Sequence, residues 1–569
     1  MAAPSAATRR KLQRKFRLRG FTLKVDALEE AAAFLERFPD AEDDALDLLL
    51  DELDKEPLQS SILDRDAVRR VVALLVEAEE AVDAASTSAT SARSALRVVD
   101  AFVVPRFHYD PIKKVFYEHT GRLAIHGEAG DKASLYRDRY QVLLQRLSRD
   151  KYFSKPAFDT VTSEGGSCEI TSIQSLIGCT GRRWIMGVIS QLEERQFYLE
   201  DLTGAVPIGF FAENTVIVAE GELLSNGIFQ VNTCGFPPLE DREASLSLLM
   251  GLDFFGGGVL PTEETLRLSS LEKKAVNDMF VILSDVWLDN PEKTMEKLAV
   301  VLDGYDSVEV VPSLFVFMGN FCSRPCNLAF NSFEELRLQF GKLGEMIAAR
   351  SRLNEHSRFL FVPGPDDAGP SKALPRCALP KYLIEELQKH IPNAIFVSNP
   401  CRSWKKLHIL NSHCENYEVI DMHSSSNPKT NPDQVVMIKT TLHLYRVKFY
   451  TQEIVFFRQD LLYRMRRSCL IPPTTEETSD PFEHLVATIT HQSHLCPLPL
   501  TVQPIIWNYD HCLRLYPTPH TIVLGDKSEQ KAFKYTGITC FNPGSFANDS
   551  TFAAYRPCTK EVELSALEG

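Results

Sequence analysis

Four apolar runs in the second half of the chain each end in a short polar loop, and this pattern constrains the fold most. The runs are residues 279–283, 314–318, 359–362 and 521–524. Short apolar runs with helical stretches between them are typical of buried strands in an α/β arrangement. Ligand sites in such folds lie at the carboxyl ends of the strands, so we expect the four loops to form one site.

The four loops are similar to a two-metal phosphoesterase site, but most of the metal ligands are missing. Such a site needs Asp-x-His, Gly-Asp, Gly-Asn-His-Asp/Glu and Gly-His-x-His, because carboxylates and imidazoles must hold two neighbouring ions. The first motif keeps Asp285, but Trp287 replaces its His, and Asn320 replaces the bridging Asp of the second. The remaining degenerate positions are Pro365, Asp366, Asp367 and Asp526. The sequence therefore predicts a phosphoesterase fold that is retained for something other than hydrolysis, with no catalytic residues, metal or cofactor.

One metal-binding alternative stays open at the third loop. Asp366 and Asp367 carry oxygen ligands of the kind that hold a weakly bound hard cation. We expect instead that both are surface-exposed acids without a metal.

Length and composition limit the classes of protein to consider. With 569 residues the chain is too long for one core, and about three domains are expected. A net charge of −14 argues against a chain that coats nucleic acid by itself. The 13 cysteines include no Cys-x-x-Cys pair, so we expect free thiols rather than a structural zinc site. No apolar run approaches the roughly 18 residues that span a bilayer, so we expect no membrane partner.

Residues 1–80 are predicted to form a small helical bundle that docks onto a charged partner. Apolar residues recur at helical spacing, as in Leu46, Leu49, Leu50 and Leu53. The basic stretch 9–19 is compatible with a transit peptide, a nuclear signal, a phosphate contact or a solvated helix face, and the helical interpretation fits best. The acidic patch beside it is compatible with a docking surface or with a plain solvated face. The candidate docking residues are Arg14, Arg17, Asp43, Asp44, Asp47 and Asp51.

Residues 81–96 are rich in Ala, Ser and Thr, which indicates a flexible tether. Residues 97–276 then show five short strands, and the sequence Ser225-Asn226-Gly227 is typical of a hairpin turn. Five strands in about 50 residues predict an OB-type β-barrel with extensions on either side. The expected strands are 184–189, 196–199, 206–211, 215–224 and 228–233.

Residues 277–569 are predicted to form a calcineurin-like two-sheet sandwich flanked by helices, so the whole chain is a multidomain α+β protein. The strands expected in addition to the four runs above include 394–398, 434–442, 454–457, 505–507 and 538–541.

Several strings, in this order, resemble the B-subunit family of replicative DNA polymerases, in particular its epsilon type. They are Lys15-Phe16-Arg17-Leu18-Arg19-Gly20, Phe456-Phe457-Arg458-Gln459-Asp460-Leu461, Ser493-His494-Leu495-Cys496-Pro497-Leu498-Pro499-Leu500 and Asn542-Pro543-Gly544-Ser545-Phe546. The resemblance covers nearly the whole chain. It implies an OB domain joined to an inactive phosphoesterase domain, and it matches His494 to the one motif His that is retained.

The same resemblance implies a function and a set of partners. It implies a nuclear, non-catalytic subunit that binds the catalytic subunit's C-terminal region and links it to a component of the replicative helicase through residues 1–80. Small histone-fold polymerase subunits and weakly bound DNA are further implied partners.

Two alternatives remain from different functional classes. One is an active metal-dependent phosphoesterase or exonuclease that uses Asp285, Asp366, Asp526 and His494 as ligands. The other is a single-stranded DNA-binding module that uses the OB domain. That module would need basic and aromatic side chains on one barrel face. The candidates are Arg182, Arg183, Trp184, Arg195, Phe197 and Tyr198, although we expect the strand aromatics to be barrel core.

Overall fold

The computed structural model divides into two compact units, Met1–Ser91 and Ala92–Gly569. It describes residues 101–154, 168–193, 196–208, 213–249, 252, 254, 262–326, 330–401, 448–449, 451–469 and 478–567. In the first hundred residues it describes 12, 15–17, 19, 21–24, 26–28, 30–31, 46, 49–50, 62–63, 65, 68–69, 71–72 and 96–97. Among all of these, no helix is both long and apolar enough to cross a membrane.

The first unit has a helical core, as predicted, together with a short sheet that was not predicted. Its buried cluster includes Leu12, Phe16, Leu49 and Val68, all from residues in helical conformation. The strands β1 (Thr22–Leu23) and β2 (Ile62–Leu63) pair in parallel. A two-residue strand carries no periodicity, so the hydrophobic pattern does not reveal it.

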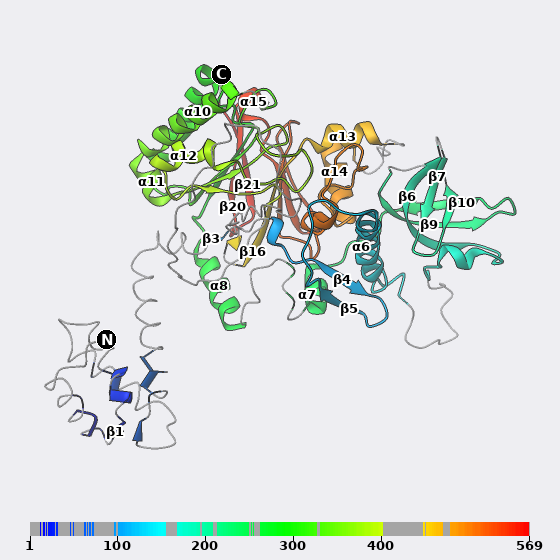
Figure 1. Ribbon diagram of the computed structural model, residues 1–569, viewed down its shortest axis with the longest axis horizontal. Coiled ribbons are helices and arrows are strands. Elements are labelled where there is room, and N and C mark those ends of the chain that lie inside the picture. Colours follow the sequence, from blue (N-terminus) through cyan, green and yellow to red (C-terminus); the bar gives the residue numbers. More distant parts are fainter. Residues whose placement is uncertain are drawn as a thin grey trace, which may run out of the picture. The chain divides into compact units, whose positions relative to one another are not determined.

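The second unit contains the predicted OB-type barrel (Figure 1). All five expected strands are present. Their order is β10-β9-β6-β7-β8, and β8 and β10 also contact each other. The strands are β6 (Arg183–Glu193), β7 (Gln196–Glu200), β8 (Ala205–Ile208), β9 (Val216–Leu223) and β10 (Phe229–Gly235). Alternation places Ile185 and Ile189 in the barrel core, and Met186 and Val188 on the opposite face of β6.

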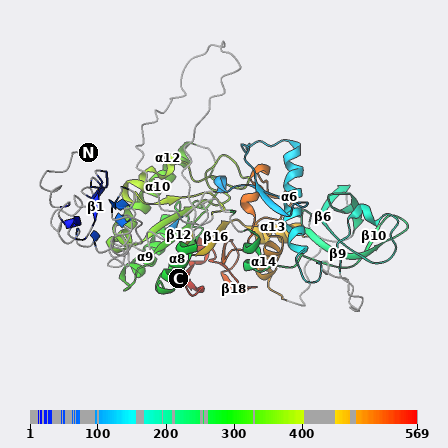
Figure 2. The ribbon, with the colours of Figure 1, turned by 90° about the horizontal axis from the view of Figure 1, so that it is seen from below.

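The barrel is preceded and followed by extensions. The preceding elements are η1 (Ala101–Val103), the hairpin β4 (Phe107–Asp110) and β5 (Val115–Glu118), α6 (Ala129–Leu147) and η2 (Ile173–Leu176). The following ones are α7 (Arg242–Leu248) and α8 (Thr262–Lys274). Helix α6 lies between the barrel and the remaining fold (Figures 1 and 2).

The remaining fold is a sandwich of two sheets, each with six described strands. The first sheet has the order β14-β13-β12-β11-β20-β21, and its first four strands are parallel. Its strands are β11 (Phe280–Ser284), β12 (Leu314–Met318), β13 (Arg358–Val362), β14 (Ile395–Phe396), β20 (Thr551–Arg556) and β21 (Glu561–Ala566).

The second sheet has the order β18-β19-β17-β16-β15-β3, and β16, β17 and β19 are parallel. Its strands are β3 (Leu96–Arg97), β15 (Lys448–Phe449), β16 (Gln452–Arg458), β17 (Thr521–Gly525), β18 (Lys531–Tyr535) and β19 (Ile538–Asn542).

Alternating side chains explain why the strands are apolar throughout. Phe280 and Ile282 face the core between the two sheets, whereas Val281 and Leu283 face the outer helices. Both faces of a strand are therefore buried, which removes the polar alternation of a half-exposed sheet. The outer helices of the first sheet are η3 (Pro291–Met295), α9 (Glu296–Ser307), α10 (Phe330–Ala348), α11 (Ser351–His356), α12 (Lys381–His390) and α15 (Phe546–Asp549). Those of the second are α13 (Leu461–Ser468) and α14 (Pro481–His491).

Some sequence expectations differ from the structure. Residues 505–507 were predicted to be a strand, but Trp507 begins the 3-10 helix η4 (Trp507–Leu513), and Ile505 makes only an isolated bridge to Leu374. Strands β18, β20 and β21 were not predicted, and all three pair antiparallel with a neighbour. The expected strand at 434–442 lies outside the described residues. Residues 96–97 form β3, so the predicted end of the tether falls within a strand of the second sheet.

Candidate functional site

The loops after three parallel strands are joined by hydrogen bonds. After β11, Asp285 Oδ1 accepts from the backbone N–H of Asn320, 3.0 Å away. Asn320 Oδ1 accepts from the backbone N–H of Asp366 at 2.9 Å. The carboxylate of Asp367 accepts from the backbone N–H groups of Phe321 and Gly364, both at 2.7 Å. The degenerate positions on these three loops therefore do meet, as expected for the carboxyl ends of neighbouring parallel strands.

The guanidinium of Arg458, at the end of β16, lies among these loops and is fully buried. Its Nη2 donates to Asp285 Oδ1 at 2.7 Å, and its Nη1 donates to Asp460 Oδ1 at 2.7 Å. The Nη1 group also donates to the carbonyl of Gly525 at 3.0 Å, and Nε donates to the carbonyl of Gly319. The site therefore contains a permanent positive charge bonded to the carboxyl ends of β11, β12 and β17.

The charges around Arg458 stabilise one another. Burial alone would lower the pKa of Arg458, but the carboxylates of Asp285 and Asp460 raise it above its ordinary value. Burial would raise the pKa of Asp460, but Arg458 and Lys527 hold it below its usual range. Both partners are therefore ionised at neutral pH, as a buried ion pair requires.

Asp367 corrects an expectation, because it is buried rather than surface-exposed, with 5% of its surface accessible. Burial raises its pKa to about 6, although its two backbone hydrogen bonds act in the opposite direction. Its neighbour Asp366 is partly exposed and pairs with Lys372 at 3.0 Å. Asp367 therefore fastens two loops together, and its oxygens are already used by backbone donors.

Two further degenerate loop positions, Pro365 and Asp526, are also occupied by internal contacts. The carbonyl of Pro365 accepts from Arg376 Nη1 at 2.8 Å, so a second buried arginine supports this loop. Asp526 is buried, and its carboxylate accepts from the N–H groups of Leu462 at 3.0 Å and Ser528 at 2.9 Å. The oxygen atoms of both residues are therefore used in internal hydrogen bonds rather than in metal binding.

Trp287 occupies the position of the His in the first motif, Asp-x-His, of a two-metal phosphoesterase site. Its Nε1, together with Ser284 Oγ and Asp285 Oδ2, is buried and has no hydrogen-bond partner among the described residues. Indole nitrogen is a donor only and does not bind a cation. The loss of the imidazole therefore removes a ligand without supplying another.

His494 was expected to be the retained motif histidine, but its hydrogen bonds do not reach the four loops. Its Nδ1 accepts from the N–H of Cys496 at 3.1 Å, and its Nε2 therefore donates to Asp510 Oδ1 at 3.2 Å. Burial, with the nearby Arg139, lowers the pKa of His494 to about 4. Both ring nitrogens are used, so this neutral imidazole has no lone pair to offer a metal.

A two-metal centre does not fit these residues. Among the described residues, no group of three or more His, Cys, Asp or Glu side chains is placed to hold an ion. The carboxylate that remains, Asp285, is already paired with a cation. Bringing two divalent ions beside the buried Arg458 would add uncompensated positive charge.

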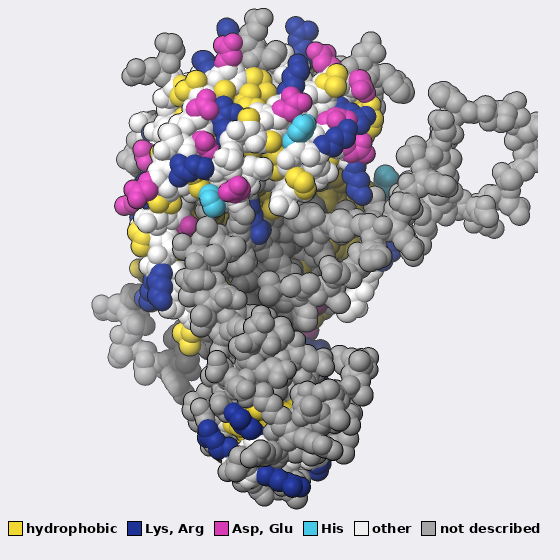
Figure 3. Space-filling view, turned by 90° about the vertical axis from the view of Figure 1, so that its left-hand side faces the viewer, with side chains coloured by type: hydrophobic (Ala, Val, Ile, Leu, Met, Phe, Trp, Pro, Cys, Tyr) yellow, Lys and Arg dark blue, Asp and Glu magenta, His cyan; other side chains and the backbone are white. Residues whose placement is uncertain are grey.

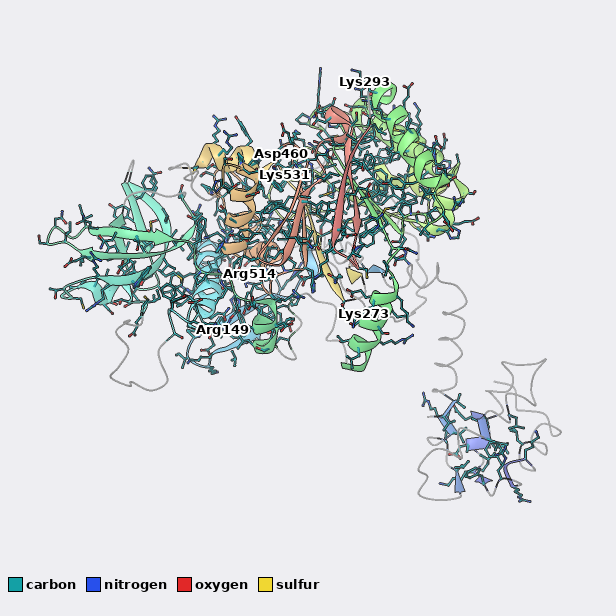
Figure 4. The ribbon with its side chains drawn as sticks, turned by 180° about the vertical axis from the view of Figure 1, so that it is seen from behind. Arg149, Lys273, Lys293, Asp460, Arg514 and Lys531 are labelled. Atoms are coloured by element: carbon teal, nitrogen blue, oxygen red, sulfur yellow. The ribbon has the colours of Figure 1, made fainter. Side chains whose placement is uncertain are left out.

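A second polar cluster lies between α6 and the sandwich. Arg139 on α6 pairs with Asp510 on η4, with Nη2 and Oδ1 2.5 Å apart, and both side chains are buried. Asp138, also on α6, pairs with Arg106 at 3.0 Å and with Arg514 at 3.2 Å. Figure 4 labels Arg514 beside α6 and Asp460 beside α13. Buried pairs of this kind fix the orientation of α6 against the sandwich.

Two of the aromatic OB candidates are half-buried against apolar neighbours, and only Phe197 packs on the barrel core as expected, since Trp184 lies on the opposite face of β6. Trp184 packs edge-to-face against Phe153, with ring centroids 5.4 Å apart, and Phe197 packs against the barrel core. Arg182 and Arg183 are exposed, whereas Arg195 lies outside the described residues.

On the face with α10–α12, basic and acidic side chains are interspersed (Figure 3). The described part of that face lacks the uniformly positive field that attracts nucleic acid.

Arg17 is exposed, whereas Arg14, Asp43, Asp44, Asp47 and Asp51 lie outside the described residues.

Sequence reasoning missed the role of Arg458. The signal was a charged residue directly after the apolar run 454–457, with Asp460 two residues later. A charge at the carboxyl end of a buried strand points to the same edge as the four loops.

Family models match three parts of the chain. "DNA polymerases epsilon N terminal" matches residues 5–74, and "DNA polymerase epsilon subunit 2-like, OB-fold domain" matches 129–238. The model of the DNA polymerase alpha/epsilon B-subunit matches 280–444 and 445–534. These matches follow the helical, barrel and sandwich parts of the chain.

Whole-chain relatives agree with the family models. The DNA polymerase epsilon B-subunit of Arabidopsis thaliana is 59% identical, covering 98% of this chain and 99% of the relative. DNA polymerase epsilon subunit 2 of Homo sapiens is 32% identical, covering 97% of each. A solved archaeal phosphodiesterase covers 51% of this chain and 99% of its own, at 8% identity and a TM-score of 0.22. By its whole-chain relatives and the three family models that it matches, the chain belongs to the B-subunit family of DNA polymerases as an accessory subunit of DNA polymerase epsilon in DNA replication, and it is not the catalytic subunit.

Proposed function

We propose that this subunit is a non-catalytic scaffold whose phosphoesterase-like domain has lost hydrolytic activity. The observation that carries the proposal is the buried pair of Arg458 and Asp285, which joins the site's retained acid to a protein cation. A hydrolase of this class needs that carboxylate to hold a metal that activates water.

The OB domain and the phosphoesterase-like domain together hold the C-terminal region of the catalytic subunit. The support is the buried junction at α6, where Arg139 and Asp138 pair with Asp510 and Arg514 of the sandwich. Because the junction is rigid, a partner that binds across both domains does not lose the conformational entropy of two mobile domains. A permanent interface of this kind should bury more than roughly 2,000 Å².

Co-expression of the full chain with the C-terminal region of the catalytic subunit tests this proposal. We expect a stoichiometric complex that survives gel filtration and that still forms when residues 1–91 are deleted. If the complex forms only with residues 1–91 present, the OB domain and the sandwich are not sufficient to bind the catalytic subunit. Nuclease activity is measured separately on the same preparation. A failure to bind the catalytic subunit and an unexpected nuclease activity are then two separate results.

Residues 1–80 dock onto a component of the replicative helicase, and the subunit acts in the nucleus beside the small histone-fold polymerase subunits. Support comes from the match of residues 5–74 to an epsilon-specific family model and from the separation of Met1–Ser91 as a compact unit. Tethering to an anchored body raises the effective concentration of such a domain, so a weak contact is sufficient. Salt should weaken a contact made by the basic or acidic stretches.

A pull-down of helicase components by residues 1–91, compared with residues 92–569, tests the docking assignment and leaves β3 intact. Only the shorter fragment should retain them. Retention by the longer fragment alone would contradict the assignment.

Two other functions are tested in the same preparations. An active phosphoesterase or exonuclease requires manganese-dependent cleavage that disappears in Asp285→Ala. A single-stranded DNA-binding module requires salt-dependent binding that weakens in Arg182→Ala together with Arg183→Ala.

A further inference from the structure

The contacts of Arg458 go beyond a simple ion pair. Four of the five guanidinium N–H donors are used, by two carboxylates and two backbone carbonyls. The backbone N–H and C=O of Arg458 are held as well, by the side-chain amide of Asn399 at 3.1 and 2.5 Å. Both ends of the residue are thus fixed in one geometry.

The partners of the guanidinium come from strands that are distant in sequence. Asp285 follows β11, Gly319 follows β12, and Gly525 ends β17. Arg458 itself ends β16, in the second sheet, whereas β11 and β12 belong to the first. One side chain therefore bonds the carboxyl ends of strands from both sheets.

The lack of a side chain at Gly525 leaves room for the Arg458 side chain. A Cβ at that position would lie 2.8 Å from Arg458 Cδ and 2.9 Å from Ser284 Oγ. Both distances are shorter than side-chain atoms normally allow, so any larger residue would displace the arginine. The glycine at this strand end thus accommodates the buried cation.

The local charges also match one guanidinium better than two metal ions. Asp285 and Asp460 are its two carboxylates, and Lys527 shares Asp460 at 3.4 Å. Two divalent ions would bring about twice the positive charge that these acids neutralise. Occupation by arginine and occupation by metal are therefore mutually exclusive.

We propose that the guanidinium of Arg458 takes the structural place of the metal pair, acting as a built-in cation that holds the loops of both sheets together. The loops are then fully formed without any metal, and their arrangement does not depend on metal supply. This inference goes beyond the proposed scaffold function, and it is tested by stability rather than by nuclease activity or partner binding. Its failure would leave the scaffold function standing.

The first test is a double-mutant cycle in the full chain with Arg458→Met, Asp285→Asn and both changes together. Arg458→Met leaves a buried, unpaired carboxylate, so it should lower Tm more than the double variant does. If Arg458→Met fails to fold while the double variant folds, the proposal is also supported. Additive effects of the two changes would overturn it.

The second test is chemical rescue of Arg458→Ala. This substitution removes the buried guanidinium and leaves a space that a small guanidinium compound can fill. Methylguanidinium at millimolar concentration should raise its Tm by about 2 °C or more, whereas methylammonium should not. The wild type and Arg556→Ala, which removes a partly exposed arginine, should show no such rise. EDTA should leave the wild-type Tm unchanged. Equal effects of the two cations, or a fall in wild-type Tm with EDTA, would contradict the proposal.

Discussion

Gln492 of the two-sheet sandwich pairs with the backbone of Val216 in the OB barrel. The side-chain Nε2 donates to the carbonyl of Val216 at 2.7 Å, and the N–H of Val216 donates to Oε1 at 2.8 Å. Gln492 is buried, and Val216 is the first residue of β9. The amide thus satisfies both backbone groups at the start of a barrel strand, which makes the barrel and the sandwich depend on each other.

The ion pair at the same junction should be important for stability. Arg139→Met leaves Asp510 buried without its main cation, which should cost about 3–5 kcal/mol of unfolding free energy. Urea unfolding of the full chain measures the loss. Lys113→Met, at the exposed pair with Asp110, is the matched control and should lower stability far less, because solvent screens the pair. Equal losses in the two variants would show that the buried pair does not hold the junction.

The pH dependence of stability should include a contribution from His494. Its pKa is lowered to about 4 in the folded state, whereas an unfolded histidine titrates near 6.5. Between these values the unfolded chain binds the extra proton, so stability falls as the pH falls from about 6.5 to about 4.

The comparison with a non-titrating variant isolates this contribution. His494→Asn should lose the slope, which is at most about 1.4 kcal/mol per pH unit, so its stability approaches the wild-type value on acidification. The matched control is His126→Asn, which removes an exposed histidine and leaves His494 in place, so the fall in stability due to His494 should remain. Parallel profiles for His494→Asn and the wild type would rule this contribution out.

Restoring two lost ligands should not restore hydrolysis. The double change Trp287→His and Asn320→Asp supplies an imidazole and a carboxylate, but Arg458 still occupies Asp285 and the other two loops stay degenerate. We expect no manganese-dependent cleavage of a chromogenic phosphodiester above that of the wild type. Cleavage that disappears on adding Asp285→Ala would contradict this prediction.

The close approach of two loops should make Gly319 intolerant of any side chain. A Cβ there would overlap the Asp367 carboxylate and the backbone nitrogen of Gly364. Gly319→Ala should therefore cost about 1–3 kcal/mol through strain, read as a lower midpoint of urea unfolding. Gly130→Ala is the control, because a Cβ in that part of α6 meets no atom within 4 Å and should stabilise by up to about 1 kcal/mol. A neutral Gly319→Ala would show that the loops can move apart.

The sequence alone determined the buried strands and the loss of ligands. Runs such as 280–284 and 314–318 are apolar on both faces because each strand packs against a second sheet on one side and helices on the other. Residue identity alone was sufficient to predict the lost ligands at Trp287 and Asn320, because a metal ligand is a matter of chemical type. The barrel strands were predictable for a similar reason, since hairpins are formed by neighbours in sequence.

Tertiary structure alone decided what fills the site and which residues join the domains. Arg458 is 173 residues from Asp285, and Arg139 is 371 residues from Asp510. Asp367 was expected at the surface because an aspartate usually is, and only the approach of two loop backbones explains its burial. His494 has the right residue type for a metal ligand, yet its pairing with Asp510 places it in the domain junction. Hydrophobic periodicity records which face of an element is buried, but the partner of a polar side chain depends on chain segments that periodicity does not connect.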